Sequence, residues 1–343
     1  MRLEKGAPMP VEGTLRDTWA VIPAAGVGAR LRPHTYTTPK AMLHVAGRPI
    51  IGHILDRVAA AGIERVALIV GAMGDQVVDY ARRTHAFREV AFRVQTERKG
   101  LGHAIWMSRE VVADAPALIV YGDTIFEGDL TLAFEADADG AIGVKRVDDP
   151  SRFGVVRVEG DRIVGLVEKP TTFVSDLAIP GVNFFRNTAL LYDCLNELIE
   201  RGIVTLGEYQ ATDAFAVMIE RGGVLKPFPV EAWYDCGAPD AVLDTNRHLL
   251  EKLPPPDLKG QAIVVPPAFV ASSARVKNAV IGPHVSIAEG ATVENAVVRD
   301  SIIGANAVVR DCVLDRSLVG NGAVVQGGAQ RLNVGDSSEI IFR

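Results

Sequence analysis

The chain has 343 residues, with 36 basic and 42 acidic side chains and a formal net charge of −6. This acidic balance argues against a nucleic-acid-binding protein, because such proteins carry a basic excess. Hydrophobic residues make up 48% of the chain, which excludes wholesale disorder, and no apolar run is long enough to suggest a membrane span. The three cysteines lie far apart and form neither a disulfide framework nor a zinc site. We expect a cytoplasmic protein of roughly two domains without nucleic-acid or membrane partners.

The first half of the chain alternates between buried strands and helices. Residues 1–18 are polar and punctuated by Pro and Gly, and we expect them to form a flexible N-terminal arm. Strands are then expected at 19–25, 65–70, 90–94 and 117–121, with helices at 49–62, 75–83 and 102–112. This alternation predicts an α/β fold with a mixed, mostly parallel, Rossmann-like sheet covered by helices on both faces. Ligands bind such sheets at the carboxyl ends of the strands.

From Ala141 the pattern changes to short strands joined by tight turns. Strands are expected at 141–145, 154–158 and 163–168, followed by helices at 188–201 and 208–221. We expect this insert to form a wall of the ligand pocket.

Three consecutive prolines at 254–256 mark a linker over residues 253–262. After it an aliphatic residue recurs every five or six positions, which is typical of the hexapeptide repeats of a β-helix. Three repeats make a coil of about 18 residues, so residues 264–325 predict roughly three and a half coils within a domain at 263–343. A coil buries its apolar faces only by stacking, and we expect this domain to mediate homo-oligomerisation as a dimer or tetramer. The recurring positions are Val270, Val276, Ile281, Ile287, Val293, Val298, Ile303, Val309, Leu314, Val319 and Val325.

A glycine-rich segment follows the first predicted strand. Gly26 and Gly28 let backbone amides approach phosphate oxygens, while Arg30 and Lys40 supply positive charge nearby. A dinucleotide-binding loop would need a third glycine, and a P-loop would need Gly-Lys-Ser/Thr, and the sequence has neither here. The pattern favours a phosphate-binding loop, with a plain structural turn as the alternative.

Eight motifs in order resemble those of the sugar-1-phosphate nucleotidylyltransferase family. They are IPAAGVGARLRP with TPKAMLHVAGRPI (22–50), VQTERKGLGHA (94–104), YGD (121–123), FGVV (153–156), VEKP (167–170), IPGVNFF (179–185), GEYQATDA (207–214) and WYDCG (233–237). The resemblance spans about residues 19–250, and the repeats beyond it resemble the left-handed β-helix of many members. It implies attack of a sugar 1-phosphate on the α-phosphorus of a nucleoside triphosphate, with pyrophosphate as the leaving group.

The resemblance also implies roles for particular residues. Asp123 and Asp235 match the carboxylates that bind Mg²⁺ in the family, and Arg30, Lys40 and Lys169 match its catalytic cations. Nucleotide-binding positions are Ala24, Ala25, Gly26, Gly28, Gln95, Gly100 and Gly122. Positions that bind the sugar phosphate are Gly154, Glu168, Lys169 and Gly181. Thr212 and Asp213 match supporting positions, and we assign no proton transfer to His103.

The motifs leave the base open between thymine and uracil, because both present the same Watson–Crick edge to Gln95. The preferred function is synthesis of a dTDP-sugar from dTTP and glucose 1-phosphate, and the alternative uses UTP. A bifunctional enzyme whose β-helix transfers acetyl groups is disfavoured, because His284 is the one histidine in the repeats. An inactive regulatory subunit is disfavoured by the retained cations and carboxylates.

Overall fold

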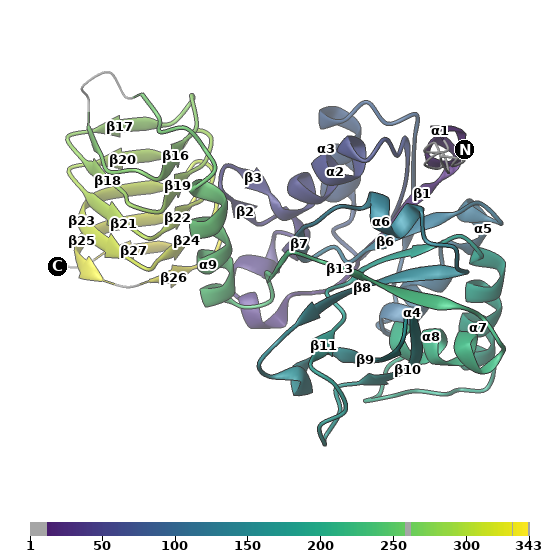
Figure 1. The fold of residues 1–343 in the computed structure, drawn as a ribbon. Helices are drawn as coiled ribbons and strands as arrows, with labels where there is room; N and C mark the ends of the chain where they lie inside the picture. Colours follow the sequence, from purple (N-terminus) through teal and green to yellow (C-terminus); the bar gives the residue numbers. More distant parts are fainter. Residues whose placement is uncertain (1–11, 258–261, 331, 342–343) are drawn as a thin grey trace, which may run out of the picture.

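The computed structural model describes residues 12–257, 262–330 and 332–341. An α/β unit is followed by a β-helix, and helix α9 (Pro239–Leu250) lies between the two (Figure 1). The expected N-terminal arm falls mostly outside the described residues, but residues 12–17 of it form the short helix α1 (Glu12–Asp17). None of the helices in the described ranges combines the length and the hydropathy of a transmembrane segment.

Ten strands form the main sheet of the α/β unit. They are β1 (Trp19–Ala24), β4 (Arg65–Val70), β5 (Glu89–Val94), β6 (Ala117–Val120), β8 (Gly140–Arg146), β9 (Gly154–Glu159), β10 (Arg162–Glu168), β11 (Leu177–Ala178), β12 (Val182–Phe185) and β13 (Leu225–Pro229). Their order is β10-β9-β11-β8-β12-β6-β1-β4-β5, with β13 beside β8. The strands β6, β1, β4 and β5 are parallel, whereas β12 runs antiparallel between β6 and β8. The predicted mixed sheet is therefore confirmed.

Helices cover both faces of this sheet because successive residues of each central strand point to opposite sides. On β1, Ala20 and Ile22 belong to one core cluster, whereas Trp19 and Val21 belong to the other. The first cluster includes α2 and α3, and the second includes α4, α7 and α8. The helices of the α/β unit after α1 are α2 (Ile50–Ala60), α3 (Asp75–Thr84), α4 (Leu101–Trp106), α5 (Arg109–Val112), α6 (Thr131–Phe134), α7 (Thr188–Glu200) and α8 (Ala211–Glu220).

Two of the predicted helices differ from the structure. The helix expected at 102–112 is two helices, α4 and α5, separated by Met107 and Ser108. Ser108 is fully buried, and its hydroxyl donates to the Ile105 carbonyl at 2.6 Å, a local bond that competes with a continuous helix. The helix expected from residue 208 begins at Ala211, because the backbone amides of 208 and 209 bond to Thr205 and Lys99.

Two small antiparallel pairs complete the α/β unit. β7 pairs with β14, and β2 pairs with β3. The first pair brings the segment after β6 beside the WYDCG motif, since Asp235 lies opposite Thr124. These strands are β2 (His44–Val45), β3 (Arg48–Pro49), β7 (Thr124–Glu127) and β14 (Ala232–Asp235).

The C-terminal domain is a stack of parallel strands coiled into a β-helix, as predicted (Figure 1). One face has five strands, β16-β19-β22-β24-β26, so the stack has more levels than the three and a half coils expected. The apolar period continues beyond Val325 through Val334 and Ile340, which the sequence reading left out. The strands are β15 (Ile263–Val264), β16 (Ala268–Val270), β17 (Arg275–Lys277), β18 (Val280–Ile281), β19 (Val285–Ile287), β20 (Thr292–Glu294), β21 (Val297–Arg299), β22 (Ile302–Ile303), β23 (Val308–Asp315), β24 (Leu318–Val319), β25 (Val324–Gln330), β26 (Asn333–Val334) and β27 (Glu339–Ile341).

The coils turn at asparagine and aspartate residues that adopt the left-handed backbone conformation. Asn278, Asn295 and Asp311 have φ values of 48°, 50° and 53°, a region that these residue types tolerate better than most. They stack above one another through hydrogen bonds between residues 17 and then 16 positions apart. The coil is thus slightly shorter than the 18 residues expected.

Candidate active site

The glycine-rich loop after β1 is built around a left-handed turn. Gly28 has φ +59°, and a Cβ atom there would lie 2.9 Å from Thr35 Cγ2, so glycine is required. Thr35 Oγ1 donates to the Gly28 carbonyl at 2.8 Å, which fixes the turn from the other side. The chain then enters a 3₁₀ turn at Ala29–Leu31 that carries Arg30.

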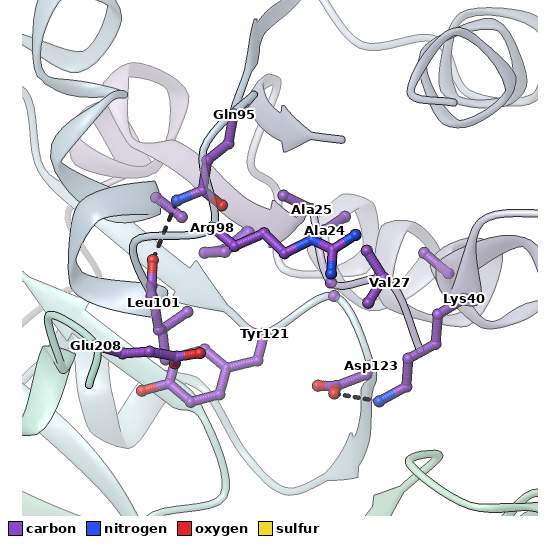
Figure 2. Close-up of a pocket in the computed structure, with 16 residues that line it drawn as sticks. Ala24, Ala25, Val27, Lys40, Gln95, Arg98, Leu101, Tyr121, Asp123 and Glu208 are labelled. Carbon is purple, nitrogen blue, oxygen red and sulfur yellow. Dashed lines mark hydrogen bonds and ion pairs between the residues drawn. The ribbon is translucent and has the colours of Figure 1, made fainter. Parts of the chain in front are cut away.

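This loop forms one wall of a cleft of about 380 Å³ at the carboxyl ends of β1 and β6 (Figure 2). The cleft is within the usual size range of small-molecule sites. All of the predicted nucleotide-binding positions except Gly28 line it, together with Lys40 and Asp123. The opposing segments approach closely at Gly122, where a Cβ atom would lie 2.7 Å from the Pro23 carbonyl oxygen.

The far wall of this cleft, called here the nucleotide cleft, follows β5. Gln95 Nε2 donates to the Gly100 carbonyl at 3.1 Å and lies 3.0 Å from His103 Nδ1. Gly100 has φ +95°, and a Cβ atom there would lie 2.7 Å from the Tyr209 carbonyl oxygen. The glycine is therefore needed for the close packing of this segment against the backbone of Tyr209. Burial lowers the pKa of His103, so its imidazole is biased toward the neutral form.

A second cleft, the sugar cleft, lies beside the first and also has a volume of about 380 Å³. Glu168 and Lys169, at the end of β10, line it together with Gly154. Thr212 Oγ1 donates to Glu168 Oε2 at 2.8 Å, and Lys169 Nζ lies 3.7 Å from Glu168 Oε1. A Cβ atom at Gly154 would lie 2.9 Å from Glu168 Oε2, so this glycine leaves space for the carboxylate.

Gly181 does not line the sugar cleft but supports its wall. It has φ +96°, and a Cβ atom there would lie 2.2 Å from the Tyr121 ring. The backbone amide of Tyr121 also donates to the Gly181 carbonyl at 2.9 Å. Tyr121 lines both clefts, so Gly181 acts on their shape through this ring.

The two clefts share Leu101, Tyr121 and Asp123. Asp123 Oδ2 accepts from Lys40 Nζ at 2.5 Å, as Figure 2 shows. Asp235 lines the sugar cleft, and the amide of Cys236 next to it donates to the Asp123 carbonyl at 3.1 Å. The structure thus brings together the two carboxylates that lie 112 positions apart in the sequence.

Cations surround this carboxylate pair. Burial, and then the negative charge of Asp123, raise the pKa of Asp235, while Lys40, Arg30 and Arg152 act in the opposite direction. A Cβ atom at Gly237 would lie 2.6 Å from Arg30 Nη2 and 2.8 Å from Asp235 Oδ1. The glycine of the WYDCG motif therefore gives the Arg30 guanidinium access to the pair.

Asp123 and Asp235 offer two carboxylates to a divalent cation. Their carboxylate oxygens are the ligands that Mg²⁺ prefers. Within residues 12–257, 262–330 and 332–341, no group of three or more His, Cys, Asp and Glu side chains could hold a metal. The pair fits an ion that takes its other ligands from phosphate oxygens and water, which is usual for Mg²⁺.

Several lining residues were not predicted from the sequence, among them two arginines and two aromatic residues. Arg98 lines the nucleotide cleft, and Figure 2 shows its guanidinium extending toward the Ala24–Val27 loop. Tyr121 lies between the clefts, and Arg152 and Trp233 line the sugar cleft. Arg98, Tyr121 and Trp233 lie inside the motifs already singled out, so their position in those motifs was the available signal.

Comparisons with known proteins agree with this arrangement. Residues 19–252 match the family described as nucleotidyl transferase, and residues 258–332 match the GlmU-like C-terminal hexapeptide family, which supports a left-handed β-helix. The "Bifunctional protein GlmU" of Methanococcus vannielii is 33% identical over 248 residues, or 69% of this chain. The chain spans only 56% of that protein's length.

A second relative covers nearly the whole chain. The glucose-1-phosphate thymidylyltransferase of Streptomyces griseus is 29% identical over 93% of this chain and 98% of its own length. Among solved structures, a protein from Bacillus anthracis assigned as a glucose-1-phosphate thymidylyltransferase, in complex with sucrose, has a TM-score of 0.61. It is 26% identical and covers 70% of this chain and 98% of its own. The chain therefore belongs to the nucleotidyl transferase family.

Proposed function

We propose that this protein transfers a nucleotidyl group from a nucleoside triphosphate to a sugar 1-phosphate. The observation that supports the proposal best is the pair of adjoining clefts that share Asp123. One is walled by a glycine-rich loop suited to phosphates and the other by Glu168 and Lys169. Two substrates bound in these clefts would meet at the carboxylate pair.

The reaction is an in-line displacement. A phosphate oxygen of the sugar 1-phosphate forms a bond to the α-phosphorus, and the bond from that phosphorus to the bridging oxygen breaks as pyrophosphate leaves. Such a reaction depends on positioning and on neutralising charge rather than on covalent help from the protein. The role of the protein is therefore to hold the two substrates in line.

Particular residues perform this positioning. Backbone amides around Gly26, together with Arg30, Lys40 and Arg98, would bind the triphosphate. Lys169 would bind the phosphate of the sugar substrate, and Glu168, oriented by Thr212, would accept a hydrogen bond from a sugar hydroxyl. Gln95 would contact the base.

Asp123 and Asp235 would hold Mg²⁺. When bound, the ion supplies charge stabilisation to the phosphate oxygens. Lys40 Nζ, which contacts Asp123, would supply a second positive charge to those oxygens.

For the substrates we propose dTTP and glucose 1-phosphate. The Streptomyces griseus thymidylyltransferase matches this chain across both the α/β unit and the β-helix, which favours this pair. The alternative is UTP, because thymine and uracil differ only in a methyl group worth about 1 kcal/mol of discrimination.

The test is a matrix of dTTP, UTP, GTP, ATP and CTP against glucose, galactose, mannose and N-acetylglucosamine 1-phosphates, with Mg²⁺ and pyrophosphate release as the readout. We expect the largest kcat/KM for dTTP with glucose 1-phosphate. A larger kcat/KM for UTP would replace thymine with uracil as the proposed base. If none of the substrate pairs released pyrophosphate, the proposed activity would be overturned.

We further propose that residues 253–262 are a linker between a catalytic domain at 19–252 and an oligomerising β-helix at 263–343. Acetyl transfer by the β-helix is not proposed. His284 accepts a hydrogen bond from Asn246 of α9 through its backbone carbonyl, so this segment is engaged at the boundary with the α/β unit. Light scattering of the full chain tests the assembly, and a monomeric mass would contradict it.

A further inference from the structure

The loop that carries Arg30 and Lys40 contacts the far end of the β-helix. Thr37 and Thr38 both donate their hydroxyl hydrogens to Asp336 Oδ2, the second at 2.5 Å. Asp336 lies between β26 and β27, nearly 300 positions away in the sequence. The β-helix therefore reaches the loop that forms the nucleotide cleft.

Two further contacts accompany this one. His34 Nε2 hydrogen-bonds to Asn333 Oδ1 of β26. A Cβ atom at Gly335 would lie 2.8 Å from the Cβ atom of Pro33, so the β-helix backbone packs directly on the loop. The contact thus extends along residues 33–38.

Asp336 is itself fixed within the β-helix. Its other carboxylate oxygen, Oδ1, accepts from the backbone amide of Asn321 at 2.8 Å. One carboxylate therefore joins a coil of the β-helix to two threonines of the loop. Hydrogen bonds to a carboxylate are stronger than those between neutral groups, so the two bonds from Thr37 and Thr38 restrain the loop more than two neutral bonds would.

The β-helix can serve as a fixed support because it is anchored at a second place. Asn246 of α9 is fully buried, accepts hydrogen bonds from Ala46 N and Ser286 Oγ, and donates to the His284 carbonyl. Arg247 makes a two-bond ion pair with Asp300. Buried polar contacts satisfied in this way hold two elements in one relative position.

The apolar interior continues across the same boundary. Ile302 and Leu318 of the β-helix belong to the core cluster that contains Leu31 of the loop and Val242 of α9. The loop therefore lies between the anchored β-helix and the nucleotide cleft. The residues of the loop that contact the β-helix, 33–38, line neither of the two clefts.

We propose that Asp336 is a positioning residue for the nucleotide site. Through Thr37 and Thr38 it holds the loop so that Arg30 and Lys40 face the phosphates, and it touches neither substrate. Without this support the loop samples other conformations, and nucleotide binds only the fraction of molecules in the competent one. The proposal rests on the proposed function for its kinetic consequence but not for its effect on the loop.

The first test uses the free full-length protein and does not depend on activity. Hydrogen exchange of peptides covering residues 28–42 is compared between the parent and Asp336→Ala. We expect exchange in this segment to become several-fold faster in the variant. A matched control is Asp311→Asn, since Asp311 bonds to Asn295 and Gln326 within the β-helix. Unchanged exchange in Asp336→Ala would overturn the proposal.

The second test uses steady-state pyrophosphate release with dTTP and glucose 1-phosphate. We expect Asp336→Ala and the double variant Thr37→Val with Thr38→Val each to raise KM for the nucleotide by about fivefold or more, with kcat within about twofold. The pair Thr37→Ser with Thr38→Ser keeps both hydroxyls and should keep the parent KM.

Combining the two changes separates a shared contact from unrelated damage. The variant that combines Asp336→Ala with both valines should have a KM for the nucleotide no higher than that of the more affected of the two starting variants. All three changes remove the same contact between Asp336 and the loop. The proposal would be overturned if the increases in KM multiplied in the combined variant, or if Asp336→Ala left KM unchanged. A parent protein without activity would overturn the proposed function and leave the exchange experiment as the test of Asp336.

Discussion

Lys40 Nζ lies 2.5 Å from Asp123 Oδ2 at the point where the nucleotide cleft meets the sugar cleft. The Lys40 side chain is 10% exposed and that of Asp123 is 38% exposed, so the lysine is held from the protein side and the carboxylate faces the clefts. A divalent cation bound to Asp123 would lie close to Lys40 Nζ. We therefore expect changes at Asp123 to affect catalysis more than folding.

Replacement of Asp123 by Asn is expected to abolish most of the turnover. The variant keeps the size of the side chain but removes the charge that would hold Mg²⁺, so kcat should fall on the order of 100-fold or more. The ion pair with Lys40 is partly exposed, so the midpoint of thermal unfolding should change by only a few degrees. Pyrophosphate release and calorimetry measure the two effects.

The control for this variant is Asp129→Asn. Asp129 caps the backbone amide of Thr131 at 2.9 Å and lines neither of the two clefts described above. Its replacement should leave kcat close to that of the parent. Unchanged turnover in Asp123→Asn would remove Asp123 from the proposed metal site.

Replacement of Arg98 by Ala is expected to weaken nucleotide binding. Its guanidinium extends into the nucleotide cleft, and one charge-assisted contact to phosphate predicts a rise in KM for dTTP of about tenfold. The adjacent Lys99→Ala is the matched control, because Lys99 pairs with Glu97 at 2.7 Å. Equal effects of the two changes would contradict a specific role for Arg98.

The sequence predicted the order and type of the central elements because their patterns are local. The buried strands β1, β4 and β6 and the amphipathic helix α2 carry their apolar period within a few residues. The β-helix was also predictable because its repeat is short. The number of coils was underestimated because the aliphatic positions were followed only to Val325, whereas Val334 and Ile340 belong to the same core.

Two helix boundaries were predicted wrongly because they depend on hydrogen bonds that the apolar periodicity does not show. The break between α4 and α5 depends on the buried hydroxyl of Ser108, which also lies 2.9 Å from the Tyr192 hydroxyl of α7. The late start of α8 depends on the bond from Tyr209 N to the Lys99 carbonyl. The Ser108–Tyr192 and Tyr209–Lys99 contacts join segments that lie far apart along the chain, whereas the Ser108–Ile105 bond is local.

The contacts within the site were likewise not predictable from the sequence. The motifs identified the glycines, but not the atoms that a side chain at each position would contact. Gly181 avoids the Tyr121 ring rather than a substrate, and Gly100 avoids the backbone of Tyr209. The contact from Asp336 to Thr38 joins the two ends of the chain, and only the folded arrangement shows it.

Replacement of Gly181 by Ala is expected to damage both folding and the clefts. The new Cβ atom would lie 2.2 Å from the Tyr121 ring, and the backbone φ of +96° is unfavourable for alanine. The free energy of unfolding should fall by about 2 kcal/mol or more, and KM for both substrates should rise because Tyr121 lines both clefts. Chemical denaturation and steady-state kinetics measure these effects.

Gly160→Ala separates the two causes. Gly160 also has a positive φ, +62°, but a Cβ atom there meets nothing within 4 Å. This variant should lose only the backbone contribution, about 1 kcal/mol, and keep the parent KM values. A Gly181→Ala protein no less stable than Gly160→Ala would contradict the steric argument.

Replacement of Asp213 by Asn is expected to stabilise the protein at neutral pH. Burial raises the pKa of Asp213, and a hydrogen bond with Thr205 only partly opposes that shift. Among the described residues, nothing donates a hydrogen bond to its buried Oδ2. The ionised carboxylate therefore costs stability that a neutral amide of the same shape does not.

The sign of the pH dependence follows from the raised pKa. The parent is most stable, as far as this group is concerned, below the usual Asp pKa of about 3.9, where the carboxyl is protonated in both states. That stability is lost as the pH rises through the higher pKa of the folded protein. The advantage of Asp213→Asn should be small near pH 4 and should grow to about 2 °C in unfolding midpoint at neutral pH.

The matched control is Asp193→Asn, on the exposed side of α7. Its unfolding midpoint should follow that of the parent across the same pH series, because an exposed carboxylate stays hydrated in both states. An Asp213→Asn protein that is less stable than the parent at neutral pH would mean that the carboxylate makes a favourable contact in the folded state. Differential scanning calorimetry from pH 4 to 8 distinguishes the two outcomes.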